Sequence, residues 1–268
     1  MIHVAGIDVG AGTAKTVILR DDTVVSYSIV KVTDNVAKVA EIATEEALGK
    51  AGLSLENLVY IVSTGYGRSA VSYANKVSSE IICHASGVYF LIKEARTIID
   101  IGTQDSKVIR IDESGRIINF AMNDECAAGT GRFLEVMASA LGLKLDEMGP
   151  SSLGSRNPCP ISSTCTVFAE SEVITLRAQG RTVNDLVAGI HKGIATRVAI
   201  MGTEIGFERE IVFTGGVAKN SGVKKALEDV VNMTILTPVE PQITGALGAA
   251  LIAKAEFRSL RSKGGVID

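Results

Sequence analysis

Apolar residues recur with two different periods along the chain, and each change of period marks the border of an expected strand or helix. Short apolar runs, in two cases flanked by a Gly-rich turn, predict strands at residues 3–9, 15–20, 58–65, 97–102, 107–111, 116–122 and 210–214. Helical spacing predicts helices at residues 34–52, 129–141, 166–179, 183–205 and 243–257. The alternation of strands and helices indicates an α/β protein.

The segment 183–205 has a clear helical pattern, because an apolar side chain recurs every three or four residues. Its apolar stripe consists of Val183, Leu186, Val187, Ile190, Ile194, Val198 and Met201. In contrast, residues 149–160, GPSSLGSRNPCP, form the one clear loop by composition. We therefore expect a long, partly buried helix after an irregular stretch.

One strand–turn–strand pattern occurs twice. Residues 6–19 read GIDVGAGTAKTVIL, and residues 98–111 read IIDIGTQDSKVIRI. The alignment, offset by 92 positions, pairs Asp8 with Asp100, Gly10 with Gly102 and Lys15 with Lys107. A tight Gly turn points consecutive backbone N–H groups at a phosphate, and an Asp at the end of the strand can hold Mg²⁺ through its waters. One copy is weak evidence, whereas two copies followed by a strand–TGGVAKN–helix segment predict a duplicated nucleotide-binding domain.

Composition narrows the possible functions. The chain has 268 residues, 46% of them apolar, a net charge of −3 and only 4% aromatic residues. These values give no indication of nucleic-acid binding, which needs basic patches or stacking aromatics. No apolar run reaches the roughly 18 residues of a membrane span, and no signal peptide is expected before the first strand. We therefore expect a soluble, cytoplasmic protein with no nucleic-acid or membrane partner.

The four cysteines have different surroundings. Cys83 lies in an apolar stretch and is expected to be buried, whereas Cys126 and Cys165 each lie just before an expected helix. Helix N-termini favour thiolates and anionic iron–sulfur clusters. Two cysteines make half of a four-thiolate set, which a symmetric dimer would complete. Spacing alone leaves open that they are small buried residues, and Cys159 is either an alternative ligand or an incidental loop thiol.

The repeated turns resemble the acetate/sugar kinase, heat-shock chaperone and actin superfamily. Its two phosphate elements correspond to DVGAGTAK and DIGTQDSK, and its adenosine element corresponds to VFTGGVAKN. The resemblance implies a duplicated actin-like ATPase fold with two lobes around a nucleotide cleft. The first lobe would comprise residues 1–94 with 245–268, and the second, residues 95–244, would carry Cys126 and Cys165.

A more specific resemblance rests on motifs in a fixed order. They include TGYGR, DIGTQDSK, NDECAAGTGRFLEVMA, ISSTCTVFAESEVI, AGIHKGIATRV and PQITGALGAA. Together they resemble the ATP-hydrolysing activators of 2-hydroxyacyl-CoA dehydratases, within the BadF/BadG/BcrA/BcrD ATPase family. The resemblance implies a homodimer that shares one 4Fe–4S cluster through Cys126 and Cys165. It also implies that an electron from ferredoxin or flavodoxin passes to the dehydratase as ATP is hydrolysed.

The same resemblance carries nucleotide contacts to individual positions. The cofactor-binding candidates are Gly10, Ala11, Gly12, Thr13, Ala14, Lys15, Gly102, Thr103, Asp146, Gly215, Gly216, Val217 and Gln242. As a mechanistic hypothesis, Mg²⁺ lies near Asp8 and Asp100, and either Gln104 or Asp105 positions the attacking water. Lys15 and Lys107 either contact phosphate or are solvated strand residues.

Two positions depart from the family pattern. Thr103 replaces the usual second Gly of the second turn, and its Cβ is expected to restrict the turn or the phosphate approach. Glu125 replaces the usual Lys before Cys126, and its carboxylate is expected to lower the potential of a cluster or weaken an acidic partner's docking. Three alternatives stay open: the ATPase subunit of a benzoyl-CoA reductase-type enzyme, a small-molecule (sugar) kinase, and a non-catalytic ATP-switched binding module.

Overall fold

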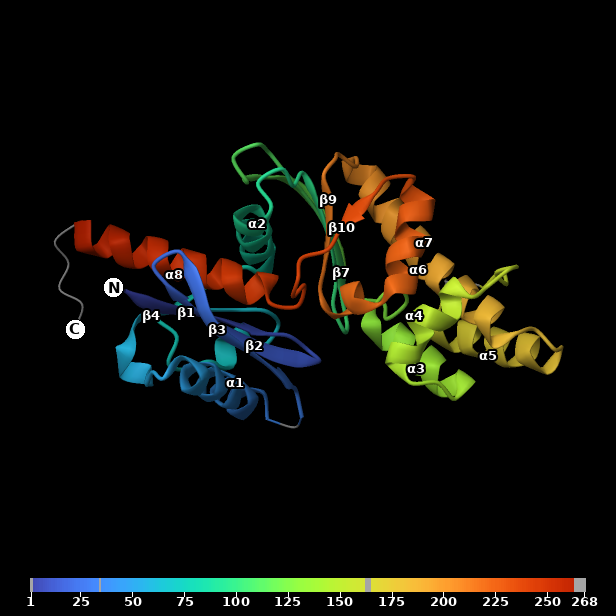
Figure 1. Ribbon diagram of the computed structural model, residues 1–268, viewed down its shortest axis with the longest axis horizontal. Coiled ribbons are helices and arrows are strands. Elements are labelled where there is room, and N and C mark those ends of the chain that lie inside the picture. The colour runs from blue at the N-terminus through green and yellow to red at the C-terminus, as the bar shows by residue number, and fades with distance from the viewer. Residues whose placement is uncertain (1, 34, 162–164, 263–268) are drawn as a thin grey trace. The chain divides into compact units, whose positions relative to one another are not determined.

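The computed structural model describes residues 2–33, 35–161 and 165–262, and its chain divides into two compact units (Figure 1). The first unit contains residues 1–93 and 242–268, and the second contains residues 94–241. The C-terminal segment thus returns to the N-terminal unit. No helix among the described residues combines the length and the apolar character needed to cross a bilayer.

The first unit is a five-stranded sheet between helices, with strand order β3-β2-β1-β4-β5. Its elements are β1 (His3–Val9), β2 (Thr13–Arg20), β3 (Thr23–Lys31), α1 (Val36–Ala51), η1 (Leu55–Asn57), β4 (Leu58–Thr64), η2 (Arg68–Ala70), β5 (Lys76–Val77), α2 (Glu80–Leu91) and α8 (Thr244–Ser262). In β1, Ala5, Ile7 and Val9 pack with α1, whereas Val4 packs with α8. The alternation of side chains along a strand therefore places Asp8 on the α8 face.

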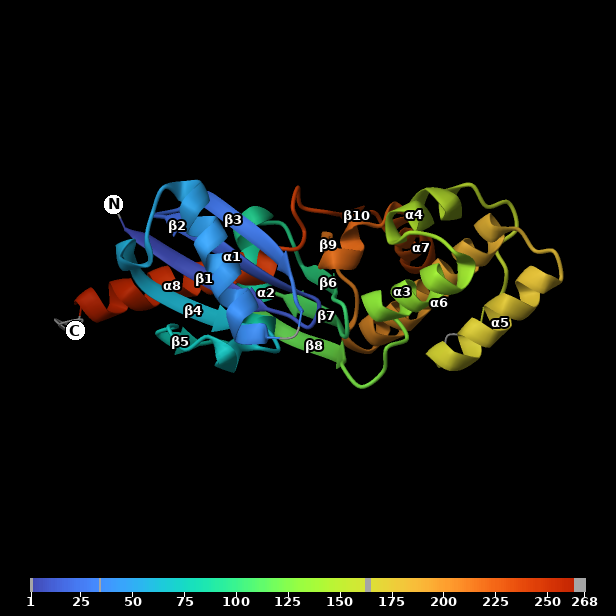
Figure 2. The same ribbon diagram turned by 90° about the horizontal axis from the view of Figure 1, so that it is seen from below.

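The second unit repeats this architecture and inserts extra helices, as Figure 2 also shows. Its elements are β6 (Thr97–Ile101), β7 (Ser106–Ile111), β8 (Ile117–Asn123), α3 (Gly131–Leu141), α4 (Leu145–Leu153), α5 (Thr166–Ala178), α6 (Val183–Ile205), β9 (Ile211–Thr214), η3 (Gly216–Lys219), α7 (Ser221–Val231) and β10 (Ile235–Leu236). Its strand order is β10-β9-β6-β7-β8. Read from the other edge, this is the order of the first sheet, with the same parallel and antiparallel neighbours.

The main core of the second unit lies under α6. The expected apolar stripe is confirmed: its five central members, Leu186, Val187, Ile190, Ile194 and Val198, are buried, and its outermost two pack against them. The stripe fixes α6 against the sheet because each buried aliphatic side chain contributes roughly 1.5–3 kcal/mol. The duplicated α/β architecture expected from the repeated turns is therefore present.

Two local predictions are wrong. Residues 149–153 belong to α4 and not to a loop, because Met148 and Gly149 are buried and Pro150 keeps a helical backbone without an N–H of its own. Helix α3 begins at Gly131, with Thr130 at its N-cap, so Cys126 lies four residues before the cap and not beside it. Cys165, in contrast, occupies the N-cap position of α5.

Candidate functional site

Each unit presents one of the repeated turns with an Asp and a Lys directly opposite each other. Asp8 pairs with Lys15 across β1 and β2, and Asp100 pairs with Lys107 across β6 and β7. Residues opposite each other in antiparallel strands project to the same face of the sheet, so each carboxylate meets its own ammonium group. A hydrogen bond from the backbone N–H of the first Gly closes both turns: Gly10 to the Thr13 carbonyl at 3.0 Å, and Gly102 to the Asp105 carbonyl at 2.9 Å.

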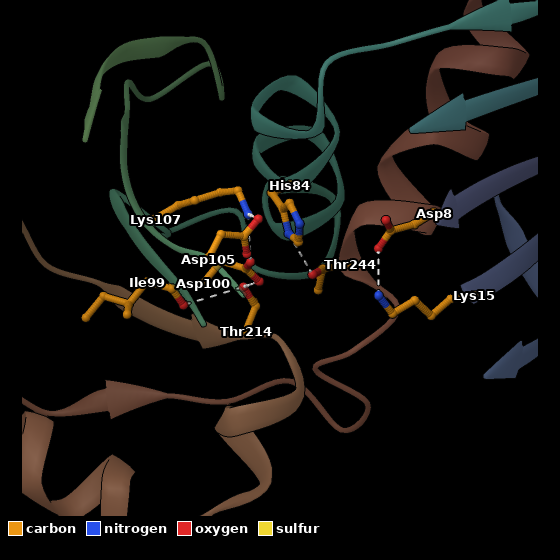
Figure 3. Close-up of polar contacts among 9 residues, drawn as sticks. All are labelled: Asp8, Lys15, His84, Ile99, Asp100, Asp105, Lys107, Thr214 and Thr244. Atoms are coloured by element: carbon orange, nitrogen blue, oxygen red, sulfur yellow. Dashed lines mark hydrogen bonds and ion pairs between the residues drawn. The ribbon is translucent and has the colours of Figure 1, made fainter. Parts of the chain in front are cut away.

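In the first unit, the Lys15 Nζ donates to Asp8 Oδ2 at 3.1 Å, as Figure 3 shows. The Lys15 side chain is 12% exposed, and the turn residues Gly10 to Thr13 are partly exposed. Ala14, at the start of β2, is fully buried between its strand neighbours. A solvent-accessible ammonium beside accessible backbone N–H groups is suited to phosphate oxygens.

The Asp8 carboxylate is enclosed by residues that the sequence analysis did not select. A Cβ on Gly245, in the first turn of α8, would lie 3.0 Å from Asp8 Oδ2 and 3.2 Å from His84 Nε2. His84 Nδ1 and the Thr244 hydroxyl lie 3.2 Å apart. Glycine at position 245 therefore leaves the space that Asp8 and His84 share. The Thr-Gly pair directly before the apolar run ALGAALIA was the available signal.

In the second unit, Asp100 and Asp105 both contact Lys107. The Lys107 Nζ lies 2.9 Å from Asp105 Oδ2 and 3.6 Å from Asp100 Oδ2, and the Thr214 hydroxyl donates to Asp100 Oδ1 at 2.8 Å (Figure 3). Lys107 is 1% exposed, so the prediction of a solvated strand residue is wrong for it. Gln104, in contrast, is exposed at the tip of the turn.

The repeat extends to the parallel neighbour of each first strand, which the sequence analysis missed. Thr64 lies beside Asp8 and Thr214 beside Asp100, and each Thr precedes a glycine with positive φ: Gly65 at 87° and Gly215 at 86°. A Cβ on Gly65 would lie 2.6 Å from the Val9 carbonyl oxygen, and one on Gly215 would lie 2.7 Å from the Ile101 carbonyl carbon. The Thr-Gly of TGYGR is thus the counterpart of the Thr-Gly of TGGVAKN.

The remaining nucleotide candidates lie at several places. Gly216 and Val217 begin η3, directly after β9, and the Gly215 N–H donates at 3.0 Å to the carbonyl of Pro241, the residue before Gln242. Asp146 is exposed in the first turn of α4, whose Gly149 lies against Ser221 at the start of α7. The structure thus places Asp146 on a helix that packs beside the predicted adenosine element.

The second turn is hydrogen-bonded to the start of α3. The Gly131 N–H donates to the Gly102 carbonyl and the Arg132 N–H donates to the Thr103 carbonyl, both at 2.8 Å. Thr103 has no positive φ, so the expected restriction from its Cβ does not arise in the backbone. The first N–H groups of a helix have no partner within the helix, and here the turn supplies two acceptors. A displacement of the turn would therefore displace α3.

The two predicted ligand cysteines differ from the other two in exposure. Cys126 and Cys165 are partly exposed free thiols, whereas Cys83 is fully buried, as expected, and Cys159 is 3% exposed. Burial raises the pKa of both the Cys83 and the Cys159 thiols, which disfavours their thiolates. Asn123 Nδ2 donates to the Cys126 carbonyl at 2.8 Å, which fixes the backbone there.

This donor set fits half of a thiolate-ligated cluster. Among the described residues, no group of three or more His, Cys, Asp or Glu side chains is placed to hold a metal ion, so this part of the chain offers no complete site. A shared site that takes two thiolates from each of two chains needs two accessible thiols on one unit, and Cys126 and Cys165 are both partly exposed. Glu125, immediately before Cys126, is exposed.

Comparisons with known proteins agree on one family. The profile of the BadF/BadG/BcrA/BcrD ATPase family matches residues 5–253. The 2-hydroxyisocaproyl-CoA dehydratase activator of Clostridioides difficile is 48% identical over 96% of this chain and 97% of its own length. The activator of lactoyl-CoA dehydratase of Anaerotignum propionicum is 48% identical over 94% of this chain and 97% of its own.

Solved structures agree with this result. The activator of the 2-hydroxyisocaproyl-CoA dehydratase from Clostridium difficile, with bound ADPNP, superimposes with a TM-score of 0.93 at 45% identity and covers 100% of both chains. A ROK family glucokinase from Streptomyces griseus, in complex with glucose and AMPPNP, reaches a TM-score of 0.58 at 12% identity over 94% of this chain and 99% of its own. The latter likeness shows the fold alone, so it does not favour a sugar kinase.

Proposed function

Because the chain belongs to the BadF/BadG/BcrA/BcrD ATPase family, we propose that it is an ATP-hydrolysing, one-electron activator of a 2-hydroxyacyl-CoA dehydratase. The observation that carries the proposal is 48% identity, over 96% of the chain, to an activator of this kind, together with two accessible cysteines on the second unit. A kinase of the same fold has no use for such a thiol pair.

The nucleotide contacts are proposed at the two turns. Backbone N–H groups from Ala11 to Lys15, together with Thr103 and Gln104, would meet phosphate oxygens, and Lys15 would add an accessible ammonium group. The nucleoside would be contacted by four further residues: Gly216, Val217, Gln242 and Asp146. The ADPNP bound to the activator from Clostridium difficile supports nucleotide binding by a chain of this fold and similarity.

The chemistry at the phosphate follows from charge and position. Asp8 and Asp100 would hold Mg²⁺ through its waters, which offsets the negative charge that develops on the phosphate. Gln104 is exposed and Asp105 is partly exposed, so either can orient a water molecule toward the terminal phosphate. The second turn is hydrogen-bonded to the start of α3, and Cys126 lies a few residues before that helix. A movement of the turn on loss of the terminal phosphate would therefore be transmitted through α3 to the segment that carries Cys126.

Cys126 and Cys165, with the same two residues of a second copy, would hold one 4Fe–4S cluster. When bound, this cluster supplies a single electron at low potential, received from ferredoxin or flavodoxin and passed to the dehydratase. A one-electron step of 59 mV corresponds to roughly 1.4 kcal/mol, so lowering a donor potential by a few hundred millivolts needs an energy source such as ATP. We propose a homodimer that works in the cytoplasm.

The test is anaerobic purification, iron analysis and a coupled assay. The expected result is a brown protein with about four iron atoms per dimer that hydrolyses ATP and activates a dehydratase on one of a panel of 2-hydroxyacyl-CoA substrates. Cys126→Ser and Cys165→Ser should each remove the iron, whereas the matched control Cys159→Ser should retain it, because that thiol is buried. A colourless monomer that phosphorylates a sugar would refute the proposal, and activity with a benzoyl-CoA reductase alone would favour that alternative.

A further inference from the structure

We infer that Lys107 is a positioning residue whose ammonium group holds Asp100 and Asp105 in place behind the second turn. Lys107 is the largest fully buried residue in the described part of the chain, with 1% of its whole-residue surface exposed. A buried ammonium is rare unless it is paired, and here carboxylates lie 2.9 and 3.6 Å from it. The two hairpins therefore give their lysines different tasks, although the sequence repeats them at the same position.

The first hairpin, which carries Lys15, can be compared directly with the second, which carries Lys107. At the 92-residue offset, Asp105 corresponds to Thr13, and both carbonyls close their turns onto the first Gly. Among the described residues, Lys15 consequently pairs with the carboxylate of Asp8, whereas Lys107 pairs with those of Asp100 and Asp105. The side-chain exposures agree, at 12% for Lys15 and 2% for Lys107.

The parallel neighbour strands show the same asymmetry. The Thr214 hydroxyl donates to Asp100, whereas the equivalent hydroxyl of Thr64 donates to the Ser78 carbonyl at 3.0 Å. Asp100 is thus held from β7 and from β9. Lys15 can leave the Asp8 carboxylate for a phosphate oxygen at a small cost in free energy. A movement of Lys107, in contrast, would leave the carboxylates of Asp100 and Asp105 without the ammonium group between them.

The experiment replaces the ammonium group and then restores it from solution. Lys107→Ala removes the atoms of one propylammonium ion, so this ion is the probe. Tetramethylammonium, which has the same charge but no N–H to donate, is the salt control. In the nucleotide-free protein, propylammonium should raise the Tm of Lys107→Ala more than tetramethylammonium does. It should not do so for wild type or for Lys224→Ala, a surface lysine paired with Glu228.

ATP turnover is the second readout, and this part rests on the proposed function. A misplaced carboxylate pair should lower kcat by roughly 100-fold, and propylammonium should recover a large part of the loss. Turnover of Lys107→Ala within about twofold of wild type, or equal effects of both salts on Tm and turnover, would overturn the inference. Selective Tm rescue in a chain whose wild type has no ATPase activity would support the positioning role and overturn the proposed function.

A second variant covers the case in which Lys107→Ala is not recovered folded. The double variant Lys107→Met with Asp105→Asn removes one positive and one negative charge, so the net charge of the cluster stays at one negative charge. It should fold and bind nucleotide but turn over at least tenfold more slowly than the matched control Asp105→Asn, because Asp100 has lost its ammonium partner. Turnover of the double variant equal to that of Asp105→Asn would contradict the role of Lys107.

Discussion

Helices α2 and α8 cross at a pair of glycines, which gives a sharp test of the packing of the first unit. A Cβ on Gly248 would lie 2.5 Å from the carbonyl carbon of Cys83 and 2.8 Å from its Cα, and a Cβ on Gly87 would lie 3.0 Å from the Gly248 nitrogen. These neighbours are backbone atoms, which no rotamer change can move. Gly248→Ala must therefore separate the two helices.

Two opposing effects set the change in the free energy of unfolding that Gly248→Ala should cause. Overpacking costs up to about 3 kcal/mol when the surroundings cannot relax, whereas Ala improves helix propensity by about 1 kcal/mol. Gly248→Ala should therefore destabilise the protein by about 2 kcal/mol, or lower its Tm by about 4–8 °C. The control is Gly49→Ala in α1, where a Cβ has nothing within 4 Å and should add about 1 kcal/mol of stability.

The assay is thermal and urea unfolding of both variants, followed by circular dichroism at a common protein concentration. The expectation is a lower Tm than that of wild type for Gly248→Ala and a higher one for Gly49→Ala. A Tm for Gly248→Ala equal to or above that of Gly49→Ala would refute it, because propensity alone would then account for both results.

Three further outcomes are expected. Burial lowers the pKa of His191 to about 4, so the unfolded chain takes up the proton first: stability is complete above pH 6.5 and falls by about 3 kcal/mol as the pH drops to 4. His191→Leu should flatten that loss in urea unfolding at several pH values, and an unchanged slope would contradict the assignment. Lys15→Met should reduce ATP turnover by roughly 100-fold in a phosphate-release assay, and activity near that of wild type would exclude a phosphate contact. Glu125→Lys should shift the cluster potential upward in a redox titration, and no shift would leave partner docking as the only predicted effect of Glu125.

The family and the fold could be predicted from the sequence because both depend on local order. The aligned turns at Asp8 and Asp100 indicated the duplication, and the apolar spacing of 183–205 indicated α6, since strand and helix periods are properties of consecutive residues. The start of α3 and the helical state of residues 149–153 were missed. The composition of residues 149–153 is typical of a loop, but these residues continue α4, whose Met148 packs against the core.

The environment of each carboxylate, in contrast, was decided by tertiary structure. The sequence repeats Lys15 at Lys107, but only the folded sheet shows that the Lys15 side chain is partly exposed, whereas Lys107 is buried beside Asp100 and Asp105. Burial and ion pairing depend on residues from strands far apart in the chain, and no local pattern encodes them. The sequence by itself determined which chemistry the chain carries, and the tertiary structure decided which copy of it is held rigidly and which can meet a ligand.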